Sequence, residues 1–181
     1  MKSIYNKRTV IIFLVLFCIA FILIQFSPFG LSGLHRITGG ASILDVRFPW
    51  YSADDAYEVF TALGPEGRDF NLTKILPLDI FFPLSYGFFF CTLTGFLYKT
   101  GGCKKRIYTG LSFLGLFAAF FDLLENICIL LMLKSYPAVS GAAAGCSNVF
   151  TQTKFMFFGS AVMSIIAGVC FIFWKRKKSK R

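Results

Sequence analysis

The sequence predicts an all-α fold: an integral membrane four-helix bundle with an extracytoplasmic loop that carries a short amphipathic helix after the first span. Of the 181 residues, 56% are hydrophobic and 18% aromatic, whereas a soluble domain holds about 45–50% apolar residues on a similar count. The apolar residues form long blocks, which is typical of membrane spans. We expect one domain, residues 1–181, with spans at about 10–27, 75–98, 107–133 and 150–174.

The basic residues predict how these spans are oriented. Clusters at Lys7 and Arg8, at 104–106 and at 175–181 each lie beside an apolar block, and such segments stay on the cytoplasmic side. We therefore expect both termini, the loop 99–106 and the tail 175–181 in the cytoplasm, and the loops 28–74 and 134–149 outside. The plasma (cytoplasmic) membrane is favoured over an organelle. We expect no nucleic-acid partner, because the net charge of +10 is not interleaved along a soluble face.

The first apolar block, Val10–Phe26, follows a short basic start, a pattern that signal peptides and first membrane helices share. The next residues, SPFGLSGLHR, offer no convincing small-x-small cleavage site, so we expect a retained helix. The six cysteines show no paired spacing, and His35 is the only histidine. Zinc sites and histidine-based triads need such groups, and we expect neither a metal nor a cofactor.

The long outer loop has two different halves. Its glycines predict irregular structure in the first half, whereas in the second Ser52 and Asp55 have the spacing of a capping box and Gly64 precedes Pro65 as a stop. The helix between them presents acids outward, while lipid-bound helices present basic residues, so we expect it to cap the outer mouth of the bundle. The glycines of the first half are Gly30, Gly33, Gly39 and Gly40. The helix of the second half has an apolar face of Ala56, Val59, Phe60 and Leu63 and an acidic face of Asp54, Asp55 and Glu58. Just before this helix, the residues Phe48, Pro49, Trp50 and Tyr51 suit the membrane interface.

The second span combines an acid with a proline. Asp79 lies about one turn below the expected outer end, and Pro83 cannot donate the hydrogen bond that the Asp79 carbonyl would receive in a regular helix. We expect a free backbone acceptor and a kink, which membrane helices tolerate where they are buried or line a cavity. The alternative is a packed kink with Asp79 hydrogen-bonded to a neighbour. Tyr86 follows about two turns further on, on a similar face.

The third and fourth spans also carry polar groups. Asp122, Glu125 and Asn126 interrupt the third span, and ionisable groups in hydrocarbon usually face a partner, a cavity or a pathway. Small residues share that face, and small residues spaced by four on the fourth span predict a packing seam. Gly141 to Gly145 matches GxxxG in a loop-like context, which makes a dimer motif a weak interpretation. The small residues are Ser112, Gly115 and Ala119 on the third span and Ser160, Ser164 and Gly168 on the fourth.

The helical rise brings these polar groups to comparable depths. At 1.5 Å per residue, Asp79 and Lys154 lie about 6 Å below the outer boundary, Glu125 about 12 Å below it and Asp122 near the midplane. Three acids against one lysine leave an excess, so either some acids are protonated or a cationic or hydrogen-bonding molecule binds. The alternative is a structural lock in which Asp79 or Glu125 pairs with Lys154. The predicted ligand-binding residues are Asp79, Tyr86, Asp122, Glu125, Asn126 and Lys154.

This polar site among phenylalanine-rich walls predicts a protein that binds a membrane lipid or an amphiphilic small molecule. One alternative is a structural or accessory subunit, in which the small-residue seams of the second and fourth spans hold a second copy or a membrane-protein partner. Others are ion or proton conduction along acids at graded depth, and an enzyme in which Asp79 or Glu125 transfers a proton. Whether the protein is an enzyme stays open.

Four spans, a long outer loop after the first, the run LDIFFPLSY and a basic tail are similar to the emopamil-binding and sigma-2 receptor family of sterol-handling membrane proteins. The likeness covers topology and one short run, and the FDLLEN segment of the third span departs from it. The resemblance implies binding of a sterol or an amphiphilic amine, or a sterol-isomerase-like activity, with Asp79 in contact with the ligand.

Overall fold

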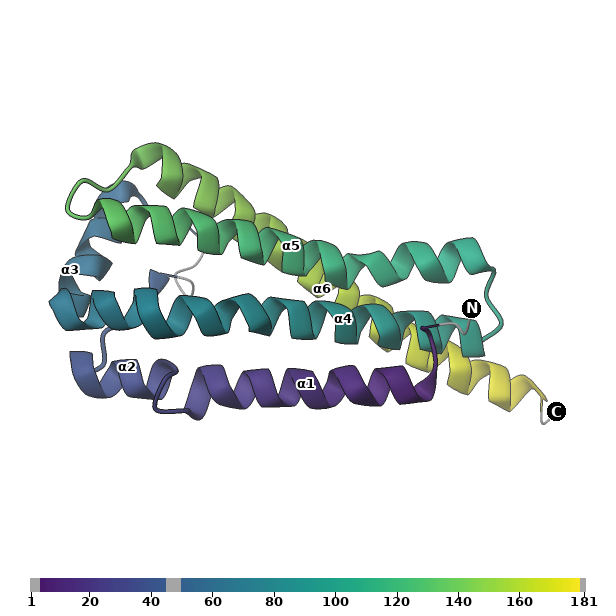
Figure 1. The fold of residues 1–181 in the computed structure, drawn as a ribbon. Helices are drawn as coiled ribbons and strands as arrows, with labels where there is room; N and C mark the ends of the chain where they lie inside the picture. Colours follow the sequence, from purple (N-terminus) through teal and green to yellow (C-terminus); the bar gives the residue numbers. More distant parts are fainter. Residues whose placement is uncertain (1–3, 45–49, 180–181) are drawn as a thin grey trace.

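The computed structural model describes residues 4–44 and 50–179, and within those ranges it is all-α, with no strand. Four helices are long and apolar enough to cross a membrane, and they run side by side (Figure 1). The predicted fold class is therefore confirmed. The four long helices are α1 (Lys7–Phe26), α4 (Leu76–Thr100), α5 (Lys105–Ser135) and α6 (Gly141–Ser179).

Helix α4 is central, because it packs against α1, α5 and α6. Gly115 of α5 lies so close to α4 that a Cβ atom there would be 2.6 Å from Cβ of Phe90. Tyr98 of α4 donates a hydrogen bond to the carbonyl of Ser164 on α6 over 3.1 Å, and Gly168 lies one turn further along the same contact. Gly115, Ser164 and Gly168 of the predicted small-residue seams thus lie at contacts between helices of this chain, as small residues do when backbones approach closely. Ser160 of the same prediction is exposed.

Helix α1 lies at the edge of the bundle (Figure 1). It packs on α4 through stacked rings, with centroids 5.2 Å apart for Phe13 and Phe88 and 5.7 Å apart for Phe17 and Phe89. Within Lys7–Phe26, all of it described, Ile24 alone is buried. Most of α1 therefore presents apolar side chains outward, as a helix surrounded by lipid does.

Two shorter helices, α2 (Leu31–Thr38) and α3 (Ala53–Phe70), close the end of the bundle away from the chain termini (Figure 1). The capping box of α3 is confirmed: Ser52 Oγ accepts from the Asp55 amide over 3.1 Å, and the Asp55 carboxylate accepts from the Ser52 amide over 2.8 Å. The predicted apolar face is buried against the ends of α4, α5 and α6, so α3 is the expected cap. This core joins Ala56, Val59, Phe60 and Leu63 to Ile75, Ile129, Met132 and Ala144.

Tyr51 fastens the segment before α3 to α6. Its hydroxyl donates to Ser147 Oγ over 2.6 Å, and its amide donates to Asn148 Oδ1 over 3.1 Å. Trp50 is exposed, which agrees with an interfacial position. Phe48 and Pro49, which the sequence also assigned to the interface, lie outside the described residues.

The first half of the outer loop was predicted to be irregular, and this prediction is wrong because it contains α2. Leu34 anchors that helix, since its side chain is fully buried in the core beneath the cap. Gly39 ends it with φ of 69°, a left-handed conformation that glycine adopts without a Cβ penalty. Gly30 and Gly33 lie against neighbouring backbone. Gly39 therefore ends a helix, and Gly30 and Gly33 allow close packing of the backbone.

The predicted stop at Gly64 and Pro65 is a kink. Gly64 has φ of 64° and ψ of 177° inside α3, after which the helix resumes, because proline is tolerated in a first helical turn. The chain then passes through a π-helical turn, η2 (Asn71–Ile75), directly into α4. Much of the predicted loop 28–74 is therefore helical.

Helix α6 begins at Gly141 rather than near residue 150, so the predicted loop 134–149 is too long. The hydroxyl of Ser140 accepts from the Ala143 amide over 3.3 Å, and the alanine-rich first turns favour a helix. Gly141 and Gly145 thus lie in a helix and not in a loop. At 39 residues, α6 is about 58 Å long, and its C-terminal end extends past the other helices (Figure 1).

Candidate functional site

A buried cluster of charged side chains joins α5 to α6. Nζ of Lys154 lies 3.0 Å from Oδ1 of Asp122 and 2.5 Å from Oε2 of Glu125. The side chain of Glu125 is 1% exposed and that of Lys154 10%. Charges at this depth persist only when they are paired and hydrogen-bonded. The pairing of Glu125 with Lys154 is the contact that the structural alternative predicted.

Hydroxyl groups complete the cluster. Tyr86 of α4 donates to Oδ2 of Asp122 over 2.9 Å, and Thr151 of α6 donates to Oε1 of Glu125 over 2.7 Å. Each carboxylate therefore has one oxygen facing the ammonium and the other facing a hydroxyl. Together these contacts tie α4, α5 and α6 at one level, and we call Tyr86, Asp122, Glu125, Thr151 and Lys154 the ion cluster.

Lys154 lies about 20 Å along α6 from Gly141. The sequence placed it about one turn below the outer membrane boundary and placed Asp122 near the midplane, and the structure pairs these two side chains. The depths themselves stay predictions.

The proline of α4 has the predicted consequence. The carbonyl of Asp79, which Pro83 cannot reach with a hydrogen bond, accepts one from Nδ2 of Asn126 over 2.9 Å. This bond links α4 to α5 at the residue directly after Glu125. Asn126 thus faces the α4 backbone, and it also lines a shallow apolar hollow beside Leu123 and Ile127.

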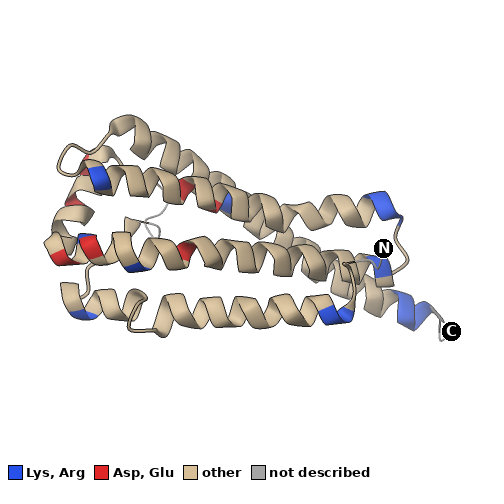
Figure 2. Ribbon diagram, in the orientation of Figure 1, with Lys and Arg blue, Asp and Glu red and all other residues tan. Residues whose placement is uncertain are grey.

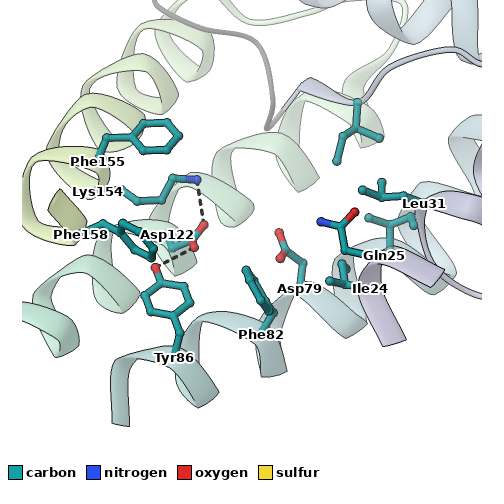
Figure 3. Close-up of a pocket in the computed structure, with 12 residues that line it drawn as sticks. Ile24, Gln25, Leu31, Asp79, Phe82, Tyr86, Asp122, Lys154, Phe155 and Phe158 are labelled. Atoms are coloured by element: carbon teal, nitrogen blue, oxygen red, sulfur yellow. Dashed lines mark hydrogen bonds and ion pairs between the residues drawn. The ribbon is translucent and has the colours of Figure 1, made fainter. Parts of the chain in front are cut away.

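A pocket of about 250 Å³ opens beside the ion cluster, between α1, α4 and α6. Figure 3 shows the carboxylate of Asp79 on its wall, with Tyr86, Asp122 and Lys154 toward one end and Gln25 toward the other. The remaining lining is apolar. It consists of Ile24, Leu31, Ile43, Ile75, Phe82, Phe155 and Phe158.

The flanks of this pocket are α1 and α6, which make no substantial contact with each other among the described residues. Phe155 lines the pocket and is also 46% exposed on the outer surface of α6. The pocket therefore lies between two helices that are long and apolar enough to span a membrane. We call it the α1–α4–α6 pocket.

The structure brings most of the predicted site residues together. Asp79, Tyr86, Asp122 and Lys154 line the pocket, whereas Glu125 is buried behind Lys154. Sequence reasoning missed Gln25, although an amide near the end of the first span is a signal that could have found it. The aromatic lining could not be singled out, because the chain contains 24 phenylalanines.

No group of three or more His, Cys, Asp or Glu side chains in the described residues could hold a metal ion. Comparisons with family models, curated protein sequences and solved structures found no match, and the likeness of LDIFFPLSY to the emopamil-binding and sigma-2 receptor family stays a resemblance of topology and one short run. Its four spans and the ion cluster show that the chain is a multi-pass membrane protein with buried acidic and basic groups.

Proposed function

We propose that this protein binds a lipid-like or amphiphilic molecule in the α1–α4–α6 pocket. The observation that carries the proposal is the make-up of the pocket wall, in which apolar side chains meet a polar edge of Asp79, Tyr86, Asp122 and Lys154. Ligand pockets commonly combine an apolar lining with a few placed polar groups. A molecule with an apolar body and a polar head matches both parts.

The charge of the site favours a basic head. Among the described residues of the pocket and the ion cluster, the carboxyl groups are those of Asp79, Asp122 and Glu125, and the ammonium is that of Lys154. Lys154 pairs with Asp122 and Glu125, and the carboxylate of Asp79 lies on the same wall toward Gln25 (Figure 3). A cationic head near Asp79 would make a charge contact with this carboxylate, and such contacts are stronger in apolar surroundings than in water.

The position of the pocket between α1 and α6 favours access from the lipid phase. A ligand dissolved in the membrane would pass between α1 and α6 without crossing water, and its body would contact Ile24 and Phe158. In the orientation with both termini in the cytoplasm, which the basic end of the bundle favours, the pocket faces the outer leaflet. Under that orientation α2 and α3 cover the bundle on the outer side.

A test compares two probes of equal chain length, a fluorescent long-chain amine and the matching long-chain alcohol, on protein in nanodiscs. Asp79→Asn should weaken binding of the amine about tenfold, the loss expected for one charge contact of about 1.4 kcal/mol, and should leave binding of the alcohol nearly unchanged. Asp69→Asn makes the same chemical change on an exposed residue of α3 and is the matched control.

Thermal unfolding of both variants shows whether they keep the fold. The proposal is contradicted if the wild-type protein binds neither probe, or if Asp79→Asn and Asp69→Asn change the binding of the amine equally. Loss of both probes from a folded Asp79→Asn protein would show that Asp79 shapes the pocket, and it would overturn the assignment of a basic head.

A further inference from the structure

The basic end of the bundle carries a second hollow, unrelated to the α1–α4–α6 pocket. Thr100 and Gly101, at the end of α4, and Ile172, Lys175 and Arg176 of α6 line a pocket of about 220 Å³. Nζ of Lys175 donates to the carbonyl of Gly101 over 2.8 Å, which holds this side chain at the junction of the two helices. We call this hollow the basic pocket.

The basic pocket lies where the apolar part of α6 gives way to charge. Trp174 is 61% exposed, and exposed tryptophans gather at the boundary between hydrocarbon and headgroups. Ile172 precedes it, and Lys175 and Arg176 follow it. The pocket therefore has an apolar side toward the membrane interior and a cationic side at headgroup depth.

The surroundings of the basic pocket are cationic. Figure 2 shows Lys and Arg at this end of the bundle, and it colours no Asp or Glu there among the described residues. The sequence contains no acidic residue between residues 80 and 121, or after Glu125. No carboxylate on α5 before Asp122, or on α6, can therefore neutralise Lys175 and Arg176.

We propose that the basic pocket binds the phosphate of an anionic phospholipid headgroup, with Lys175 and Arg176 as its ligands and Ile172 against the start of an acyl chain. An ammonium has three N–H donors, so the bond to Gly101 leaves Lys175 able to donate to a phosphate. Arginine adds a planar set of donors that matches phosphate oxygens. Basic pockets between membrane helices on the cytoplasmic side bind anionic headgroups in this way.

A diffuse attraction between a positive surface and an anionic membrane would not need a pocket. The test must therefore distinguish binding in the basic pocket from diffuse attraction. The variant Lys175→Gln/Arg176→Gln removes the two basic residues that line the pocket. The control Lys177→Gln/Lys178→Gln removes the same charge from the next two positions of α6, which are exposed like Lys175 and Arg176 but do not line the pocket. Arg176→Gln alone is a third variant that leaves the Lys175 bond to Gly101 in place.

Delipidated protein is mixed with equal amounts of phosphatidylglycerol and phosphatidylcholine, and the retained lipid is measured by native mass spectrometry. We expect preferential retention of phosphatidylglycerol, a loss of at least about fivefold in Lys175→Gln/Arg176→Gln and a smaller loss in Arg176→Gln, because each basic residue near the headgroups contributes about fivefold to binding. The control keeps both proposed phosphate ligands, so its loss of retention should be smaller than that of Lys175→Gln/Arg176→Gln.

Equal losses in the two double variants would overturn the site in favour of diffuse charge. Retention without preference for phosphatidylglycerol would also overturn it. A further arm adds inorganic phosphate alone: displacement of the lipid by millimolar phosphate would indicate a site for free phosphate and contradict the lipid assignment. Helical circular dichroism of each variant confirms that the compared proteins are folded.

Discussion

The two halves of the bundle differ in the residues that lie between their helices. Toward the basic end, α4 and α5 approach through Gly87 and Gly115, and a buried hydroxyl such as that of Thr92 bonds to its own helix, here the Phe88 carbonyl at 2.8 Å. Toward the capped end, paired charges and hydroxyl groups join α4, α5 and α6, and a pocket lies beside them. Small residues let backbones close on one another, whereas buried charges need partners. The α1–α4–α6 pocket lies in the half that contains these paired charges.

If the ion cluster holds the capped half together, the largest effect should come from removing its single ammonium. Lys154→Ala leaves Asp122 and Glu125 buried without their cation, and we expect a loss of about 3–5 kcal/mol in unfolding free energy, measured by denaturant titration in detergent. Lys134→Ala, at an exposed position of α5, should cost less than about 0.5 kcal/mol. Equal stabilities of Lys154→Ala and the wild type would show that the cluster does not support the fold.

In the half toward the basic end, the unfolding free energy should depend instead on the side-chain volume between α4 and α5. Gly115→Ala places a methyl group 2.6 Å from Cβ of Phe90, and overpacking of this kind costs about 1–3 kcal/mol. Gly110→Ala is the control on the same helix, because nothing lies within 4 Å of its added Cβ, and it should be neutral or slightly stabilising. A stable Gly115→Ala protein would mean that α4 and α5 separate easily, which would remove the contrast between the halves.

A smaller effect is expected where a neutral group meets the cluster. Tyr86→Phe removes the donor to Asp122 and should lower the unfolding free energy by about 1–2 kcal/mol. In a double-mutant cycle with Lys154→Ala, the two changes should be non-additive, because both residues contact the same carboxylate. Strict additivity would contradict the shared cluster.

Much of this arrangement could be predicted from the sequence. Long apolar blocks and flanking basic residues specify the four spans, and a proline four residues after Asp79 predicts the acceptor that Asn126 uses. The spacing of Asp122 and Glu125 along α5 follows from the helical rise alone. Such features depend on spacing along one helix, which sequence records directly.

The remainder depends on how helices meet. The start of α6 was misplaced because alanine, glycine and serine suit both loops and helices, and the buried contacts of Tyr51 and Ala144 decide between them. Which acid pairs with Lys154 depends on the rotation of α6 about its axis, which no pattern in the sequence fixes. Gln25 and Phe158 share a pocket only because α1 lies against α4 and apart from α6.

The central claim is that the capped half holds a pocket open to the lipid phase that takes up a basic amphiphile. It is tested most directly by Phe158→Trp in a background where Trp50→Phe and Trp174→Phe remove the native tryptophans. The account predicts that phospholipids brominated along the acyl chain quench this tryptophan, that the long-chain amine relieves the quenching, and that Asp79→Asn abolishes the relief. Phe60→Trp, fully buried in the cap, should stay unquenched. A tryptophan at position 158 that lipid never quenches, or that the amine fails to protect, would contradict the account.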